Sequence, residues 1–192
     1  MDALYKTELE KITEGHVFYS FDNKDAYLNN LIAFILSGIE NQHQILIIES
    51  MRYLPIVRTM IDKLVSAEHQ STIRVVNNYE YYLSSGDFNT HTILTHFAND
   101  LSLLKRENSS IRTWAHVEWA SSEPDAQLLK DFELSSDDFV LEEGILSVCA
   151  YSSKHLTSNL SVALEQSHKY VMTDETLSVS TLYEKSDCND RC

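Results

Sequence analysis

The stretch from His16 to Ser50 constrains the fold of this chain most, because it has the pattern of a complete βαβ unit. The pattern predicts a strand, a turn, a helix and a second strand at residues 16–21, 22–25, 26–41 and 44–50. Within the second strand, the run Ile45–Ile48 is continuously apolar, which is typical of a strand buried on both faces of a parallel sheet. The unit therefore predicts an α/β domain.

The turn after the first predicted strand, Asp22-Asn23-Lys24-Asp25, contains no glycine. In α/β proteins that bind nucleotides, this turn is a glycine-rich loop whose backbone holds phosphate at the start of the next helix. The chain has only four glycines, at positions 15, 38, 86 and 144, and no window fits a Walker-type loop. We therefore expect a nucleotide-binding architecture without its phosphate site.

The rest of the chain continues the alternation of strands and helices, without an internal repeat or a proline-rich linker. Further strands are predicted at 72–77, 111–119, 145–151 and 169–173, with an edge strand within 176–183. Further helices are predicted at 2–13, 54–67, 89–107, 122–135 and 155–166, and residues 79–88 form an aromatic, turn-rich segment. We expect one mostly parallel sheet with helices on both faces, and a ligand crevice outside the carboxyl ends of the strands.

Charge argues against several classes of partner. Lys and Arg total 15 against 29 Asp and Glu, a formal net charge of −14, so we expect no direct contact with nucleic acid. The first residues lack the basic and apolar regions of a signal peptide, and no apolar run reaches the roughly 20 residues of a membrane span. We expect a cytoplasmic protein without membrane contact.

The three cysteines do not predict a metal site. Cys149 stands in an apolar run and is expected to be an inert core residue. Cys188 and Cys192 form a C-x3-C pair in the polar tail, which could be redox-active or bind metal, but a closed zinc site needs four ligands. No cofactor and no bound metal are therefore expected.

Residues at the ends of the predicted strands are the candidates for ligand contact. They are Glu49, Asn77, Trp119 and Tyr151 by position, with His116 and Glu118 on one face of the fourth strand by its period of two. The His-x-Glu pair could bind a metal or act as acid and base, but two side chains do not make a metal site, so ligand recognition or a buried polar pair is preferred. No catalytic residue is assigned, because a G-x-S-x-G elbow is missing and an apolar strand disfavours a Cys149 thiolate.

Histidine and aromatic residues supply further candidates. His16 and Tyr19 lie in the first strand, where His16 either contacts a ligand beneath the crevice or is satisfied at the strand start. Three residues of the aromatic segment are candidates: Tyr79, Tyr82 and Phe88. Together with Tyr81, they either line a pocket or plug the space left by the lost phosphate loop. His168 and Asp174 flank the last strand, and His168 could orient the turn instead of touching a ligand.

Five short motifs occur in order along the chain: His16-Val-Phe-Tyr19, Phe34-Ile-Leu-Ser-Gly-Ile39, Tyr82-Leu-Ser-Ser-Gly-Asp-Phe88, Cys149-Ala-Tyr151 and His168-Lys-Tyr-Val-Met-Thr-Asp174. With these motifs the sequence resembles the MEDS domain, the methanogen/methylotroph DcmR-type sensory domain. Lys169 stands where the family would have proline, and Ser152 where an acidic residue often follows the tyrosine. The resemblance implies a three-layer RecA/KaiC-like fold lacking the Walker A loop.

The resemblance also implies a domain organisation and a function. Residues 14–175 would form the sensory domain, preceded by an amphipathic helix over 1–13 and followed by an edge strand and polar tail over 176–192. We expect a non-catalytic regulatory domain that binds a small organic molecule and signals through a protein partner such as a histidine kinase or transcription factor. Two alternatives remain: a pure protein-interaction regulator without a ligand, and residual nucleotide binding. The sequence leaves a homodimer open.

Overall fold

The computed structural model describes residues 9, 11–83, 88–119 and 125–183. The strands are β1 (Gly15–Phe21), β2 (Gln44–Glu49), β3 (Ile73–Asn77), β4 (Ile111–His116), β5 (Leu146–Ser152), β6 (Tyr170–Met172) and β7 (Leu177–Val179). The helices are α2 (Lys24–Glu40), α3 (Leu54–Leu64), α4 (Ala67–Gln70), α5 (Asn78–Tyr82), α6 (Thr90–Leu104), α7 (Ala126–Glu143) and α8 (Ser158–Ser167), with a 3-10 turn, η1 (Ser153–His155).

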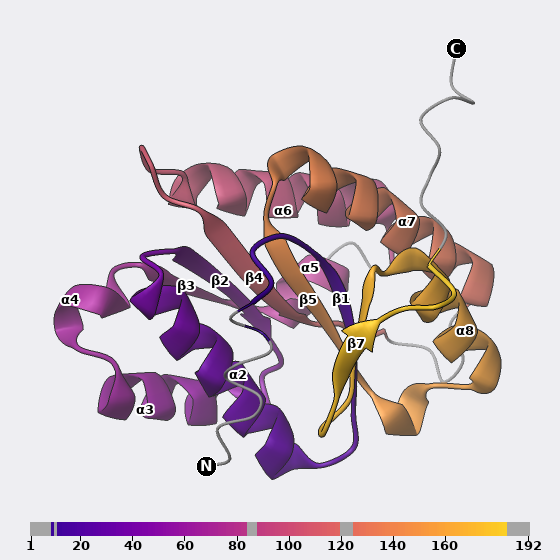
Figure 1. The fold of residues 1–192 in the computed structure, drawn as a ribbon, viewed down its shortest axis with the longest axis horizontal. Coiled ribbons are helices and arrows are strands. Elements are labelled where there is room, and N and C mark those ends of the chain that lie inside the picture. The colour runs from indigo at the N-terminus through magenta and orange to yellow at the C-terminus, as the bar shows by residue number, and fades with distance from the viewer. Residues whose placement is uncertain (1–8, 10, 84–87, 120–124, 184–192) are drawn as a thin grey trace.

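The strands form one sheet in the order β3-β2-β4-β5-β1-β6-β7. All neighbouring pairs are parallel except β6 and β7, which form an antiparallel edge. The predicted mostly parallel α/β sheet and its edge strand are confirmed. Because β1, β2, β4 and β5 run in one direction, their carboxyl ends lie along the same edge of the sheet (Figure 1).

Helices cover both faces of the sheet, as predicted (Figure 1). Alternating strand side chains explain the two cores: Val17 and Tyr19 pack with α2 and α3 on one face, and Phe18 packs with α5 to α8 on the other. The run Ile45–Ile48 contributes to both cores and is almost fully buried, as its continuous apolar pattern predicted. The chain therefore forms a three-layer sandwich.

The helix predicted at 122–135 is α7, which extends to Glu143, so the predicted end at residue 135 is wrong. Asp125 caps its start, and Gly144 ends it in the left-handed conformation at φ 61°. Its buried face carries Glu133 and Asp137 among apolar residues, which hides the helical period of the apolar pattern.

Other differences are local. The helix predicted at 54–67 stops at Leu64, because Val65 is extended, and α4 follows separately. The strand predicted at 111–119 ends at His116, the last residue of β4 that pairs with β5.

The amino-terminal helix predicted at 1–13 lies mostly outside the described residues, as does the pair Cys188 and Cys192. Leu9 is described and is buried in the core beside α2. Within the described ranges, no helix is both long enough and apolar enough to cross a membrane.

Candidate functional site

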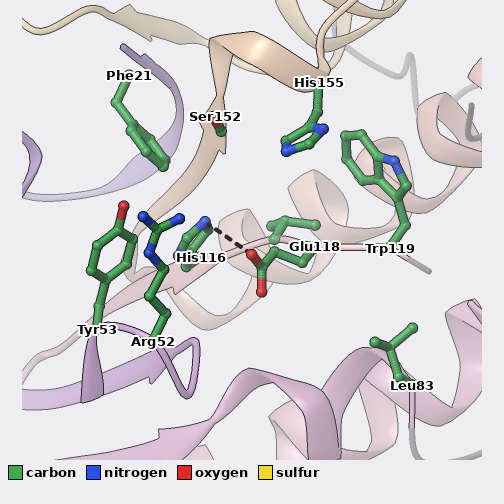
Figure 2. Close-up of a pocket in the computed structure, with 10 residues that line it drawn as sticks. Phe21, Arg52, Tyr53, Leu83, His116, Glu118, Trp119, Ser152 and His155 are labelled. Atoms are coloured by element: carbon green, nitrogen blue, oxygen red, sulfur yellow. Dashed lines mark ion pairs between the residues drawn. The ribbon is translucent and has the colours of Figure 1, made fainter. Parts of the chain in front are cut away.

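A pocket of about 610 Å³ opens at the carboxyl ends of the parallel strands. Figure 2 shows Arg52 and Tyr53 on one side of this pocket, with Trp119 and His155 across it. The strand-end crevice predicted from the sequence is therefore present as a pocket. Its lining residues are Phe21, Arg52, Tyr53, Leu83, His116, Val117, Glu118, Trp119, Ser152 and His155.

His116, the last residue of β4, is fixed in the pocket by a buried carboxylate. Its Nδ1 lies 2.7 Å from Oε1 of Glu49, the last residue of β2, which is fully buried. The same carboxylate accepts hydrogen bonds from the Ser50 backbone N–H at 2.6 Å and from the Tyr27 hydroxyl. A carboxylate that accepts these bonds also accepts a hydrogen bond from His116 Nδ1–H, and Nε2 is the nitrogen that faces Glu118.

Tyr27 supports this arrangement from α2. Burial, followed by the negative charge of Glu49, raises the pKa of the Tyr27 hydroxyl well above its ordinary value. The hydroxyl therefore stays protonated and donates to Glu49, while it accepts the indole N–H of Trp114 at 3.1 Å. The result is a hydrogen-bonded chain from the core of the sheet to the His116 imidazole.

Glu118 is the exposed acidic group of the pocket. Its side chain is 49% exposed, and its Oε1 lies 3.8 Å from His116 Nε2 (Figure 2). Asn78 positions it: the Asn78 amide donates to Glu118 Oε2 at 2.8 Å and to the His116 carbonyl at 3.0 Å. Glu118 therefore has a fixed orientation and can still accept a hydrogen bond from a ligand.

Asn77, not Asn78, was the candidate taken from the sequence. The structure gives Asn77 a capping role, since its Oδ1 accepts the backbone N–H of Tyr79 at the start of α5. The Asn-Asn pair after a strand was the available signal, but either residue could have been the cap.

Aromatic rings surround the His116 imidazole. Tyr53 is nearly parallel to it at 5.7 Å between ring centroids, and Phe21 meets it edge-on at 5.3 Å. Neither residue was a sequence candidate, although Phe21 could have been found because it ends a strand. The pocket thus combines apolar ring surfaces with a carboxylate, the imidazoles of His116 and His155, and the guanidinium of Arg52.

The described residues of the aromatic segment pack mainly beside the pocket. Tyr82 is buried and stacks on Phe88 at 5.8 Å, and Phe88 meets Phe132 of α7 edge-on at 4.9 Å. Tyr79 is exposed on α5 and does not line the pocket. Among the described residues of the segment, Leu83 lines the pocket.

Asp174 lies at the start of α2, the kind of helix terminus at which nucleotide-binding α/β proteins hold a phosphate. Its Oδ2 accepts the backbone N–H groups of Asp22 at 3.0 Å and Asn23 at 2.8 Å. The amides of Asp25 and Ala26 donate to the Asn23 side chain. Four amide groups around the start of α2 are therefore bonded within the chain.

Tyr19 belongs to this internal contact. Its hydroxyl donates to Asp174 Oδ1 at 2.6 Å and accepts from the Asn30 amide at 3.0 Å. Tyr19 is fully buried and ties β1 and α2 to the loop after β6.

His16, Tyr151 and His168 lie in a second, fully buried group on the other face of the sheet. His16 is near the amino-terminal end of β1, so it is far along the strand from Phe21 and the pocket. His16 Nε2 lies 3.2 Å from Cys149 Sγ and 3.5 Å from Oε2 of Glu133, whose other oxygen accepts the Tyr151 hydroxyl.

Burial is the largest cause of the pKa shifts of Glu133, Cys149 and His168. It raises the pKa of the Glu133 carboxyl and, together with Glu133, the pKa of the Cys149 thiol. It lowers the pKa of His168 well below its ordinary value, with His16 as the second cause. Cys149 is a buried free cysteine, as predicted. Sequence spacing gave no sign that Glu133 joins it.

Comparisons with known proteins agree with this architecture. The model of the family described as "MEDS: MEthanogen/methylotroph, DcmR Sensory domain" matches residues 15–169. No curated protein matches the chain significantly.

Three solved structures share the fold at low sequence identity. A KaiC-like protein from Pyrococcus horikoshii OT3 is 14% identical with a TM-score of 0.56, covering 84% of this chain and 71% of its own. A second structure, of an ATPase domain, is 9% identical with a TM-score of 0.54, covering 96% and 78%. The flagellar accessory protein FlaH from Methanocaldococcus jannaschii is 11% identical with a TM-score of 0.51, covering 84% and 72%. The chain therefore has the RecA/KaiC-like fold.

Proposed function

The chain belongs to the MEDS family of sensory domains, and from this premise we propose that it binds a small organic molecule in the strand-end pocket and signals through a protein partner. The observation that carries the proposal is the His116 imidazole, held between Glu49 and Glu118 inside an aromatic wall. An oriented polar pair within apolar surface is the usual composition of a small-molecule site.

The pocket chemistry indicates the class of ligand. Glu118 offers a carboxylate acceptor, so a hydroxyl or amine on the ligand would be recognised there. Phe21, Tyr53 and Trp119 offer ring surfaces for a short hydrocarbon portion. We therefore propose a small alcohol or amine with an apolar part.

Binding without turnover fits the same residues. At the start of α2, where a nucleotide phosphate would bind, four amides are already bonded to Asp174 or Asn23. The Cys149 thiol is buried away from the pocket, with a raised pKa that disfavours a nucleophilic thiolate. These contacts support a sensory role over nucleotide hydrolysis.

A protein partner could distinguish the ligand-bound domain from the ligand-free domain by contacting the surface near the pocket. Met51 and Tyr79 are exposed, and they closely follow the adjacent strands β2 and β3 at the edge that carries the pocket. An apolar contact there, on a chain of net charge −14, suits a protein partner with basic groups around an apolar centre, such as a histidine kinase or a transcription factor.

Thermal unfolding with a panel of short alcohols, amines and carboxylic acids tests the ligand part of the proposal. A binder at a hundred times its Kd stabilises the protein by about 2.7 kcal/mol. We expect Glu118→Gln and Trp119→Ala each to weaken binding of an alcohol or amine about tenfold or more. His91→Gln is the control, because His91 is exposed on α6 outside the pocket lining. A ligand that binds both pocket variants as tightly as the wild type would place its site elsewhere.

A further inference from the structure

Four buried side chains direct potential metal-ligating atoms at one point in the core. They are His16 of β1, Glu133 of α7, Cys149 of β5 and His168, which follows α8. Their donor atoms all lie within 4.8 Å of one another, and all four residues are buried. This group belongs to neither the strand-end pocket nor the function proposed for it.

Three of the donor separations match one tetrahedral ion. His16 Nε2 lies 3.2 Å from Cys149 Sγ and 3.5 Å from Glu133 Oε2, and His168 Nε2 lies 3.6 Å from the same oxygen. In a zinc site with Zn–N near 2.0 Å and Zn–S near 2.3 Å, neighbouring ligand atoms are separated by about 3.3–3.6 Å. The His16 and His168 rings, whose centroids lie 3.8 Å apart, would move apart for both nitrogens to bind at the tetrahedral angle.

Two of these atoms have no hydrogen-bond partner in the described part of the chain. Glu133 Oε2 and His168 Nε2 are fully buried and make no hydrogen bond there. A buried polar atom without a partner costs free energy, and a carboxylate costs more than a neutral group. Coordination to a cation would satisfy both atoms at once.

The outer contacts also resemble those of metal ligands. His168 Nδ1 lies 2.7 Å from the Leu164 carbonyl, which can only accept, so Nδ1 carries the proton and Nε2 keeps its lone pair. His16 Nδ1 lies 3.6 Å from Asp137 Oδ1. A metal-bound histidine commonly donates its other N–H to a carbonyl or a carboxylate, as His168 does here. His16 Nδ1 faces the Asp137 carboxylate without a hydrogen bond.

We propose that His16 Nε2, His168 Nε2, Cys149 Sγ and one Glu133 carboxylate oxygen bind a divalent transition metal ion, with zinc as the expected ion. Two imidazoles, a carboxylate and a thiolate are donors that zinc accepts, and the two anionic donors balance its charge. The bound ion would displace the Cys149 proton to solvent and so form the thiolate that burial alone disfavours. Because all four ligands are buried, the site is closed and structural. The bound ion would link β1 to β5, to α7 and to the segment between α8 and β6.

Metal content of the full-length protein tests the proposal directly. We expect about one zinc ion per chain by elemental analysis after purification without chelators. Cobalt substitution should give a thiolate-to-cobalt absorption band and the visible bands of a tetrahedral ion. Cys149→Ser should abolish the thiolate band, and Glu133→Gln and His168→Gln should each lower the zinc content several-fold.

Two controls separate this site from other binders. A Cys188→Ser, Cys192→Ser double variant removes the tail cysteines, and His91→Gln removes an exposed histidine; both should retain the full zinc content. If a ligand variant does not fold, the wild type still decides: removing its metal with a chelator should lower its melting temperature, and added zinc should restore it.

Several results would overturn the proposal. A full-length protein without stoichiometric metal, and without a rise in melting temperature on adding zinc, has no such site. A cobalt band that persists in Cys149→Ser, or a zinc content that disappears with the tail cysteines, places the metal elsewhere.

Discussion

The carboxylate of Asp174 accepts the backbone N–H of Asn23 at 2.8 Å, at the start of α2. A loop from the end of the chain thus supplies the negative charge that this helix terminus attracts. The RecA/KaiC-like fold is retained in this chain, while the helix start is closed by the chain's own side chain.

Asp174→Ala should therefore destabilise the domain. Asp174 accepts two backbone amides and the Tyr19 hydroxyl, so we expect a loss of about 1–2 kcal/mol in the free energy of unfolding. Urea denaturation followed by tryptophan fluorescence measures it. Asp174→Asn keeps one acceptor oxygen and should lose less; equal losses for the two variants would contradict a hydrogen-bonding role.

The two carboxylates beside His116 should differ in their contribution to stability. Glu49 is fully buried with three hydrogen-bonding neighbours, so Glu49→Ala should cost about 3–5 kcal/mol. Glu118 is half exposed, so Glu118→Ala should cost about 1 kcal/mol or less and act mainly on ligand binding. Chemical denaturation of both variants checks the difference, and a Glu118 loss as large as that of Glu49 would refute the assignment of roles.

Gly38→Ala should destabilise the protein although alanine favours helices. An added Cβ would lie 2.8 Å from Ile45 Cδ1 and 2.9 Å from Arg112 Cδ, and both neighbours are buried. Overpacking of this kind costs about 1–3 kcal/mol. Asn29→Ala, at an exposed position of the same helix, is the control and should be neutral or slightly stabilising. A melting temperature of Gly38→Ala at or above that of the wild type would show that the contact relaxes freely.

His43 should make the domain less stable in mild acid. Burial, and then the neighbouring Arg112, lower the pKa of His43, whose Nδ1 accepts the Arg112 Nε–H at 2.9 Å. The unfolded chain binds this proton near pH 6.5 and the folded chain only at lower pH, so stability falls as the pH drops through this window.

His43→Asn isolates the contribution of this histidine, because asparagine can present an acceptor oxygen near the Nδ1 position and does not titrate. The variant should lose less stability between pH 7.5 and about pH 5.5 than the wild type does. Identical pH profiles would exclude His43 as a source of acid sensitivity.

The sequence predicted the architecture well because the buried strands carry strong apolar patterns. Ile45–Ile48 predicted a central strand, and the alternation from Trp114 to Glu118 placed His116 and Glu118 on one face. The end of α7 was missed because Glu133 and Asp137 occupy its buried face. A polar cluster inside the core removes the periodic signal from which a helix is predicted.

The sites were less accessible from sequence, because they depend on strand order. His116, Glu118 and Trp119 were found from strand ends, but Arg52 and Tyr53 come from a loop whose path the pattern does not fix. His16, Cys149 and His168 were each noted, yet only the pairing of β1 with β5 and β6 brings them together. Pairing of strands so distant in sequence leaves no local signal.

The position of β1 also bears on how the domain is made. β1 is synthesised before the other described strands of this sheet, and both of its neighbours, β5 and β6, are synthesised after β2, β3 and β4. β2 can pair with β3 and β4 as soon as these strands are synthesised. β1 stays without a strand partner, and its apolar side chains stay exposed, until β5 and β6 are synthesised. A nascent chain stalled within α7 would therefore expose β1 to chaperones, and folding would be completed only when β5 and β6 close around it.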